Sequence, residues 1–146
     1  MKVGVLATMA FATLIGYPIA SFAGLAPDAD GDGIPDVLDK CTLDSRNATA
    51  PMTCDTDVDG YGNVCDADFD QSFGVNPTDF SMYFLPRFKS GNDAVPAPAV
   101  GADMDCSGGV NPTDFSMFFV PKFKGLLGGA IPGPSGLSCA GTPGCT

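Results

Sequence analysis

The sequence predicts a small, mostly irregular fold with short α-helices, in which bound ions and disulfide bonds supply most of the order. Three observations support this fold class: acidic side chains recur at fixed spacing in four segments, six cysteines follow residue 23, and one segment with aromatic residues at helical spacing occurs twice. Between residues 24 and 66 no apolar periodicity indicates a helix or strand of ordinary length. A core this small needs metal ions and disulfide bonds to stabilise it.

Four twelve-residue segments carry acidic or small polar side chains at positions 1, 3, 5, 9 and 12; they begin at residues 28, 55, 68 and 103. Alternate residues of a tightly wrapped loop can all point inward at a Ca²⁺ ion, which takes six to eight oxygen ligands at about 2.3–2.6 Å. The sequence therefore predicts three or four calcium ions as cofactors. The expected metal ligands are Asp28, Asp30, Asp32, Asp36, Asp39, Asp55, Asp57, Asp59, Asn63, Asp66, Asp68, Asp70, Ser72, Asn76, Asp79, Asp103, Asp105, Ser107, Asn111 and Asp114.

The composition supports the same interpretation. From residue 24 onward the chain has 17 Asp, no Glu, no His and six Lys or Arg, which gives a formal charge of −11. A disordered acidic chain is the alternative, but 15 of the 17 Asp lie inside the four segments. Without ions the loops should repel themselves open, so we expect folding and metal binding to be one process. The acidic balance argues against a nucleic-acid partner.

The first 23 residues read as a secretory signal peptide. A basic start at Lys2 precedes an apolar stretch, and Ser21-Phe22-Ala23 offers small residues for cleavage after Ala23. A membrane anchor is the alternative, since the stretch is about long enough to span a bilayer. After cleavage no second apolar run could cross a membrane, so we expect a secreted, extracellular or cell-surface protein.

The six cysteines indicate disulfide bonds rather than a zinc site, because the number is even, His is absent and no two cysteines are spaced CxxC. Fifteen connectivities are possible. Near neighbours flank the same loops, so we expect the pairs Cys41–Cys54, Cys65–Cys106 and Cys139–Cys145. In the same region, Asn47-Ala48-Thr49 fits an N-glycosylation acceptor.

A duplication covers the next part of the chain. Residues 74–89 and 109–124 agree at 13 of 16 positions, at a constant offset of 35. Each copy reads as a loop that runs into a short helix, with Asn76 or Asn111 as N-cap and a proline at the first helical position. Pro86 and Pro121 are expected to end or kink the helices after about two turns. The aromatic residues predict that the helices pack face to face; an exposed aromatic patch for a partner is the alternative.

Two family resemblances follow from these motifs. The segments DADGDGIPDVLDKC (28–41) and CDTDVDGYGNVCD (54–66) resemble thrombospondin type 3 repeats, which implies an extended, disulfide-linked chain wrapped around calcium. The pair of units over residues 68–124 resembles a dockerin, which implies half EF-hand loop-helix motifs and docking to a cohesin-like partner. Phe73 replaces the glycine at position 6 of the first unit, so we expect a weaker or shifted site there. The resemblance implies these partner-facing candidates: Thr78, Tyr83, Arg87, Thr113, Phe118 and Lys122.

These interpretations divide the chain into a signal peptide (1–23), thrombospondin type 3-like calcium repeats (24–66), a dockerin-like duplicated domain (67–125) and a Gly/Pro-rich tail with a disulfide (126–146). No constellation outside the loops suits acid–base catalysis, so we expect no enzyme activity. The predicted function is calcium-dependent protein–protein contact by a secreted structural or adhesion element, with a protein partner in the extracellular space. The alternative is a dockerin-type module that binds a cohesin-like scaffold.

Overall fold

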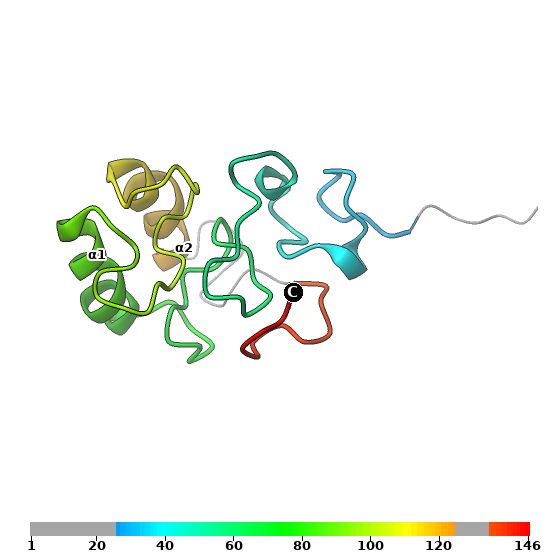
Figure 1. Ribbon diagram of the computed structural model, residues 1–146. Helices are drawn as coiled ribbons and strands as arrows, with labels where there is room; N and C mark the ends of the chain where they lie inside the picture. The colour runs from blue at the N-terminus through cyan, green and yellow to red at the C-terminus, as the bar shows by residue number, and fades with distance from the viewer. Residues whose placement is uncertain (1–25, 125–134) are drawn as a thin grey trace, which may run out of the picture.

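A computed structural model describes residues 26–124 and 135–146 of the chain (Figure 1). The expected signal peptide and the first part of the expected tail lie outside these residues. The described part contains short helices and no β-strand, and none of its helices is long and apolar enough to span a membrane. Its elements are the 3-10 helices η1 (Asp36–Leu38) and η2 (Ser45–Ala48), the π-helices η3 (Asp79–Phe84) and η4 (Asp114–Phe119), and the α-helices α1 (Leu85–Ser90) and α2 (Val120–Phe123).

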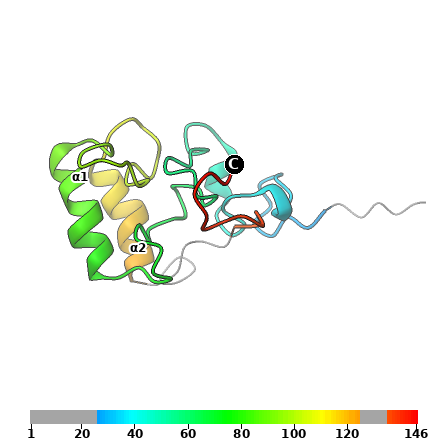
Figure 2. The ribbon, with the colours of Figure 1, turned by 60° about the horizontal axis from the view of Figure 1, so that its bottom comes forward.

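Each π-helix continues without a break into an α-helix, and the two continuous helices lie side by side (Figure 2). The expected N-caps are confirmed: Asn76 Oδ1 accepts a hydrogen bond from the Thr78 N–H at 2.7 Å, and Asn111 Oδ1 accepts the equivalent bond from Thr113 at 2.8 Å. These bonds satisfy N–H groups that have no partner inside the first turn. The loop that precedes each helix therefore also fixes its start.

The prolines do not end the helices, so the expected ending after about two turns is wrong, and the alternative, a kink, stays a prediction. Pro86 and Pro121 lie in the first turn of α1 and α2, directly after the π-helical segments. Just before each proline the hydrogen bonds run five residues back, from the Leu85 N–H to the Phe80 carbonyl and from the Val120 N–H to the Phe115 carbonyl. Both prolines therefore lie inside a continuous helix, where the wider π-helical turns change to α-helical ones. Helix α1 ends only at Gly91, which takes the left-handed conformation with φ of 68°.

The aromatic core confirms that the helices pack face to face. Phe84 and Phe119, which are equivalent in the duplication, are both fully buried and lie 4.8 Å apart between ring centroids. The distance from Phe80 to Phe119 is 5.8 Å, and the equivalent distance from Phe84 to Phe115 is also 5.8 Å. At the far end Phe88 lies 6.1 Å from Phe115. The helices are therefore antiparallel and related by a pseudo-twofold axis near Phe84 and Phe119.

The irregular first half of the described chain lies to one side of the helix pair, and the C-terminal residues lie against it (Figures 1 and 2). The three disulfide bonds are Cys41–Cys65, Cys54–Cys106 and Cys139–Cys145. The third expected pair is confirmed, and the other two are wrong. The reason is that residue 62 folds back onto residue 40, where the Gly62 N–H donates to the Lys40 carbonyl at 3.2 Å. This return brings Cys65 beside Cys41 and leaves Cys54 free to reach the second loop-helix unit.

Candidate metal centres

Four groups of three carboxylates converge in the described chain, one group in each predicted loop. In each group, one carboxylate oxygen from every residue lies within 4.8 Å of the others. The first two loops gather positions 1, 3 and 5, whereas the last two gather positions 1, 3 and 12. The groups are Asp28, Asp30 and Asp32; Asp55, Asp57 and Asp59; Asp68, Asp70 and Asp79; and Asp103, Asp105 and Asp114.

In the first loop the backbone wraps around Asp28. Its Oδ1 accepts a hydrogen bond from the Gly31 N–H at 2.8 Å, and its Oδ2 accepts one from the Gly33 N–H at 3.0 Å. Asp36, at position 9, instead accepts from the Ala29 N–H at 2.8 Å and so closes the loop. Burial raises the pKa of Asp30, and nearby carboxylates raise it further. The first loop is thus pre-wound around a concentration of negative charge.

The second loop is the most buried of the four. Burial, followed by the charges of Asp59 and Asp55, raises the pKa of Asp57 to about 7. Burial and the same cluster raise the pKa of Asp66 well above its usual range. Two donors from neighbouring segments reach this loop: Lys40 Nζ lies 2.7 Å from Asp55 Oδ2, and Gln71 Nε2 lies 2.5 Å from Asp59 Oδ2. Gln71 Nε2 also donates to Asp66 Oδ2 at 3.2 Å.

Asn63, the predicted ligand at position 9 of the second loop, makes hydrogen bonds within the protein. Its Oδ1 accepts a hydrogen bond from the Thr56 N–H at 2.8 Å. Its Nδ2 donates to the Asp103 carbonyl at 3.0 Å, which ties the second loop to the fourth. The Cys54–Cys106 disulfide joins the same two loops. The partners of Asn63 are thus hydrogen-bonding groups of the protein, and its role as a metal ligand stays a prediction.

The third and fourth loops repeat one geometry with one difference. In the fourth loop Asp103 Oδ2 accepts from the Gly108 N–H at 2.8 Å, whereas in the third loop Asp68 Oδ2 accepts from the Gly74 N–H at 2.8 Å. The bond therefore falls one residue later in the third loop. Phe73, at the glycine position, takes a positive φ of 65° and leaves 81% of its surface exposed. The expected shift of this loop is thus present in its hydrogen bonding.

The carboxylates at position 12 of these two loops are fully buried at the helix starts. Asp114 has donors on both oxygens: the Met104 N–H at 2.7 Å on Oδ1 and the Asn111 N–H at 2.8 Å on Oδ2. Asp79 Oδ2 accepts from the Asn76 N–H at 2.7 Å, while its Oδ1 has no partner among the described residues. Burial raises the pKa of Asp79 to about 6. The remaining position-5 ligands, Ser72 and Ser107, are exposed, with their hydroxyls 3.3 Å and 3.5 Å from the first carboxylate of their loops.

Three of the six candidate partner-facing residues are buried, and these three are corrections to the sequence-based expectation. Phe118, Lys122 and Arg87 are only 2–3% exposed. The segment around η2 covers the first two, because the Arg46 guanidinium lies 4.4 Å from the Phe118 ring centroid and Lys122 Nζ lies 3.7 Å from Asp44 Oδ2. These contacts join the first half of the chain to the second helix and hide that face from a partner.

Arg87 is buried by the connection between the two loop-helix units. Its guanidinium donates to the carbonyls of Pro96 and Pro98, and its Nε donates to the Asp93 carbonyl at 2.9 Å. It therefore holds the connecting segment against the first helix. The other candidates keep their accessibility: Thr78 and Thr113 are exposed, and Tyr83 is partly exposed.

The four carboxylate groups could each hold a metal ion. Of the described residues, five buried side-chain oxygens have no hydrogen-bond partner, and all five belong to the loops or to Asn47 beside them: Asp30 Oδ2, Asp32 Oδ2, Asp39 Oδ2, Asn47 Oδ1 and Asp79 Oδ1. Buried oxygens without a donor are rare and destabilising unless a cation or water meets them. Their position fits a cation with oxygen ligands. No family model, curated protein or solved structure matches the chain.

Proposed function

We propose that the chain is a secreted calcium-binding protein that acts by calcium-dependent contact with other proteins, as a structural or adhesion element outside the cell or on its surface. The observation that carries the proposal is the convergence of three carboxylates in each of four loops. A single acidic cluster is common on protein surfaces. Four clusters at one loop spacing, with unpaired buried oxygens beside them, are the arrangement expected of calcium loops.

The donor set favours calcium over other divalent ions. The chain has no His, and all six cysteines are in disulfide bonds, so the nitrogen and thiolate ligands that select zinc or copper are absent from these loops. Each loop offers hard carboxylate oxygens and a wrapped backbone with further carbonyls. Calcium accepts such irregular, oxygen-rich shells, whereas magnesium demands nearly ideal octahedral geometry.

Calcium would also offset the electrostatic repulsion that opposes this fold. Two like charges within 4.8 Å repel by about 3 kcal/mol at an effective dielectric constant of about 20. Each loop contains three such pairs, and the chain has few cations to offset them. A bound Ca²⁺ attracts each of these carboxylates and so offsets their mutual repulsion. The proposed role outside the cell follows, because millimolar calcium there would keep the chain folded and its surface in place.

We infer that the contact surface is the exposed side of the loop-helix pair. Met82 and Met117 occupy equivalent positions in the duplication and are 65% and 58% exposed. The neighbouring residues Ser81 and Ser116 are exposed as well. Phe84, Phe118 and Phe119 are buried, but Phe115 and Phe123 are 36% and 40% exposed, so these two rings join the methionines and serines in what the helices offer to a partner.

Binding of the labelled, oxidised chain from Gly24 to intact cells of its source tests this function. We expect retention at about 1 mM calcium, release by a chelator, and loss of retention when the cells are first treated with a protease. The matched control carries Asp103→Asn and Asp114→Asn, which remove charge from one loop without changing side-chain size. Retention that is the same in calcium and in chelator would contradict the proposal.

A second candidate is a docking module for a cohesin-like scaffold. Thr78 and Thr113 favour it, because both are exposed at the start of antiparallel helices related by a pseudo-twofold axis. Such a surface could bind one partner in either of two orientations. If so, Thr78→Glu and Thr113→Glu should each leave binding nearly intact, and only the double variant should lose it. A structural element with one contact face would instead lose binding with one of the single changes.

A further inference from the structure

We propose that Asn47 belongs to the first metal centre, as the residue that positions Asp39 and adds one further oxygen to the ion. This inference rests on the proposed calcium-binding function. Asn47 lies eight residues beyond the end of the first loop, in a segment that no loop spacing includes. Its place in the centre is visible only in the folded chain.

The hydrogen bonds of Asp39 are divided unequally between its two oxygens. Oδ1 accepts from the Cys41 N–H at 2.8 Å and from Asn47 Nδ2 at 2.5 Å. Oδ2 has no partner among the described residues, although Asp39 is only 1% exposed. The two donors fix the carboxylate in one orientation and leave one oxygen free. This arrangement is typical of a ligand held by a neighbouring side chain.

Asn47 itself has the same division. Its Nδ2 is used by Asp39, while its Oδ1 has no partner in the described part of the chain and the residue is 5% exposed. Four of the five unpartnered buried oxygens lie between residues 30 and 47. Asp39 is the last residue of the first loop, and its side chain is hydrogen-bonded to Asn47. The free oxygens of Asp39 and Asn47 are therefore two buried acceptors without a donor at the end of that loop.

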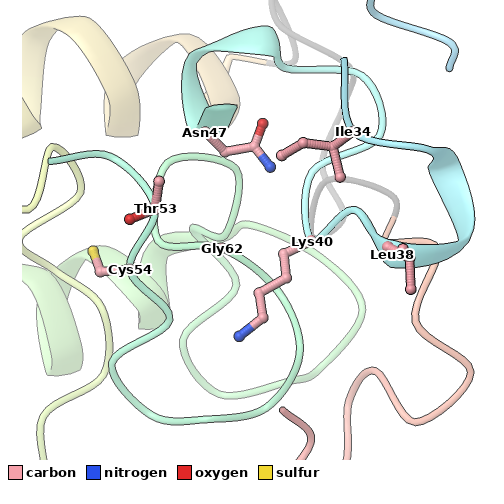
Figure 3. Close-up of a pocket in the computed structure, with 7 residues that line it drawn as sticks. All are labelled: Ile34, Leu38, Lys40, Asn47, Thr53, Cys54 and Gly62. Carbon is pink, nitrogen blue, oxygen red and sulfur yellow. The ribbon is translucent and has the colours of Figure 1, made fainter. Parts of the chain in front are cut away.

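The fold holds Asn47 in this position through contacts on both sides of it. Helix η2 is capped by Asp44, whose Oδ1 accepts from the Arg46 N–H. Asp44 pairs with Lys122, and Arg46 covers Phe118, so the second helix anchors η2. Figure 3 shows the Asn47 side chain pointing from η2 toward Ile34 of the first loop, with which it lines a pocket of about 160 Å³. The second half of the chain thus helps to build the first metal centre.

The same geometry corrects the expectation of N-glycosylation at Asn47-Ala48-Thr49. An attached glycan would replace a hydrogen on Nδ2, and this nitrogen is buried and donates to Asp39. Thr49, by contrast, is exposed. The Asn47 side chain is therefore not accessible to glycosylation in the folded chain. Thr49 belongs to the glycosylation triplet and not to the contact with Asp39, so changing Thr49 separates a glycosylation role of Asn47 from a role in the metal centre.

Calcium titration of five chains tests the inference: wild type, Asn47→Ala, Asn47→Asp, Thr49→Ala and Asp28→Ala. We expect Asn47→Ala to weaken one site about 10–100-fold, the usual effect of removing a residue that orients a metal ligand, and to leave the other sites unchanged. Asn47→Asp keeps an oxygen at Oδ1 but replaces the Nδ2 donor with a second carboxylate oxygen beside Asp39, so it should also weaken that one site and leave the other sites unchanged. Thr49→Ala destroys the glycosylation triplet alone and should behave as wild type.

The double variant Asp28→Ala with Asn47→Ala separates a metal-centre role from a general structural role. If Asn47 acts through the first centre, adding Asn47→Ala to Asp28→Ala leaves the remaining sites at the affinities of Asp28→Ala alone. A structural role would weaken those sites too and would overturn the inference, as would wild-type affinities in Asn47→Ala. A wild-type chain that binds no calcium would refute the proposed function itself. If Asn47→Ala fails to form its disulfides, Asn47→Asp decides, because wild-type affinity at every site in that variant would also overturn the inference.

Discussion

Replacing Asp79 with asparagine separates two effects of one carboxylate, because the change removes a charge and keeps the size of the side chain. Asp79 is fully buried at the start of the first long helix. Its Oδ2 accepts from the Asn76 N–H, and its Oδ1 has no partner among the described residues. Burial raises its pKa from 3.8 to about 6. In the metal-free chain this carboxylate is therefore destabilising, whereas in the calcium-bound chain we expect it to be a ligand.

The magnitude follows from the pKa. A rise from 3.8 to about 6 corresponds to about 3 kcal/mol of lost stability once the group is ionised. Because the pKa is higher in the folded chain, this loss is absent below about pH 4, grows between pH 4 and 6, and is complete at pH 7. We expect Asp79→Asn to stabilise the metal-free chain by up to about 3 kcal/mol at pH 7 and to have little effect at pH 4. In calcium the variant should lose one ion and become less stable than wild type.

Circular dichroism measures both effects: the helix signal of the metal-free chain in EDTA, and the midpoint of urea unfolding in calcium. The signal in EDTA should rise, because about 3 kcal/mol shifts the folding equilibrium more than about 100-fold, and the midpoint in calcium should fall. Asp114→Asn is the matched control, since Asp114 has the equivalent position but donors on both oxygens; it should lose an ion and gain less in EDTA. The reasoning is refuted if Asp79→Asn destabilises the metal-free chain at pH 7 as it does the calcium-bound one.

Three further predictions concern the other loops. Asp103→Ala and Asp114→Ala should each remove one ion and reduce the helix signal in calcium, and unchanged stoichiometry in calorimetry would contradict the assignment of the fourth centre. Phe73→Gly should raise the free energy of unfolding of the calcium-bound chain by about 1 kcal/mol, because glycine adopts the positive φ without strain and the exposed ring loses little packing. A loss of stability in urea unfolding would show that Phe73 packs more than its exposure suggests. Asp57 must be ionised to bind calcium, and its pKa is raised to about 7. Calcium affinity at the second centre should therefore fall roughly tenfold between pH 8 and pH 6. A chelator-competition assay should show this pH dependence in wild type and not in the control variant Asp57→Asn.

The sequence predicted those features that depend on local spacing. Alternate residues of a loop face its centre, so Asp55, Asp57 and Asp59 could be expected to converge from their positions alone. Likewise, helical spacing and the 35-residue offset were enough to predict the aromatic core between Phe84 and Phe119. These patterns operate within one loop or one helix, where the backbone geometry is nearly fixed by the residues themselves.

Features that depend on contacts between distant segments were not predictable in this way. The pairing of Cys54 with Cys106 follows from how the second loop lies against the fourth. Burial of Lys122 follows from η2 folding over the second helix, and the donors Gln71 and Asn47 reach carboxylates of other loops. No local pattern marks such contacts. For Asn47 the local signal was a glycosylation triplet, which carries no information on its contact with Asp39.

The central claim is that calcium binds these loops and builds this fold. Calorimetric titration of calcium into the refolded, oxidised chain from Gly24, with circular dichroism followed in parallel, tests it most directly. The account predicts three or four ions bound per chain together with a gain of helix, and little response to magnesium at the same concentration. Absence of binding, or binding with no change in helix content, would contradict it.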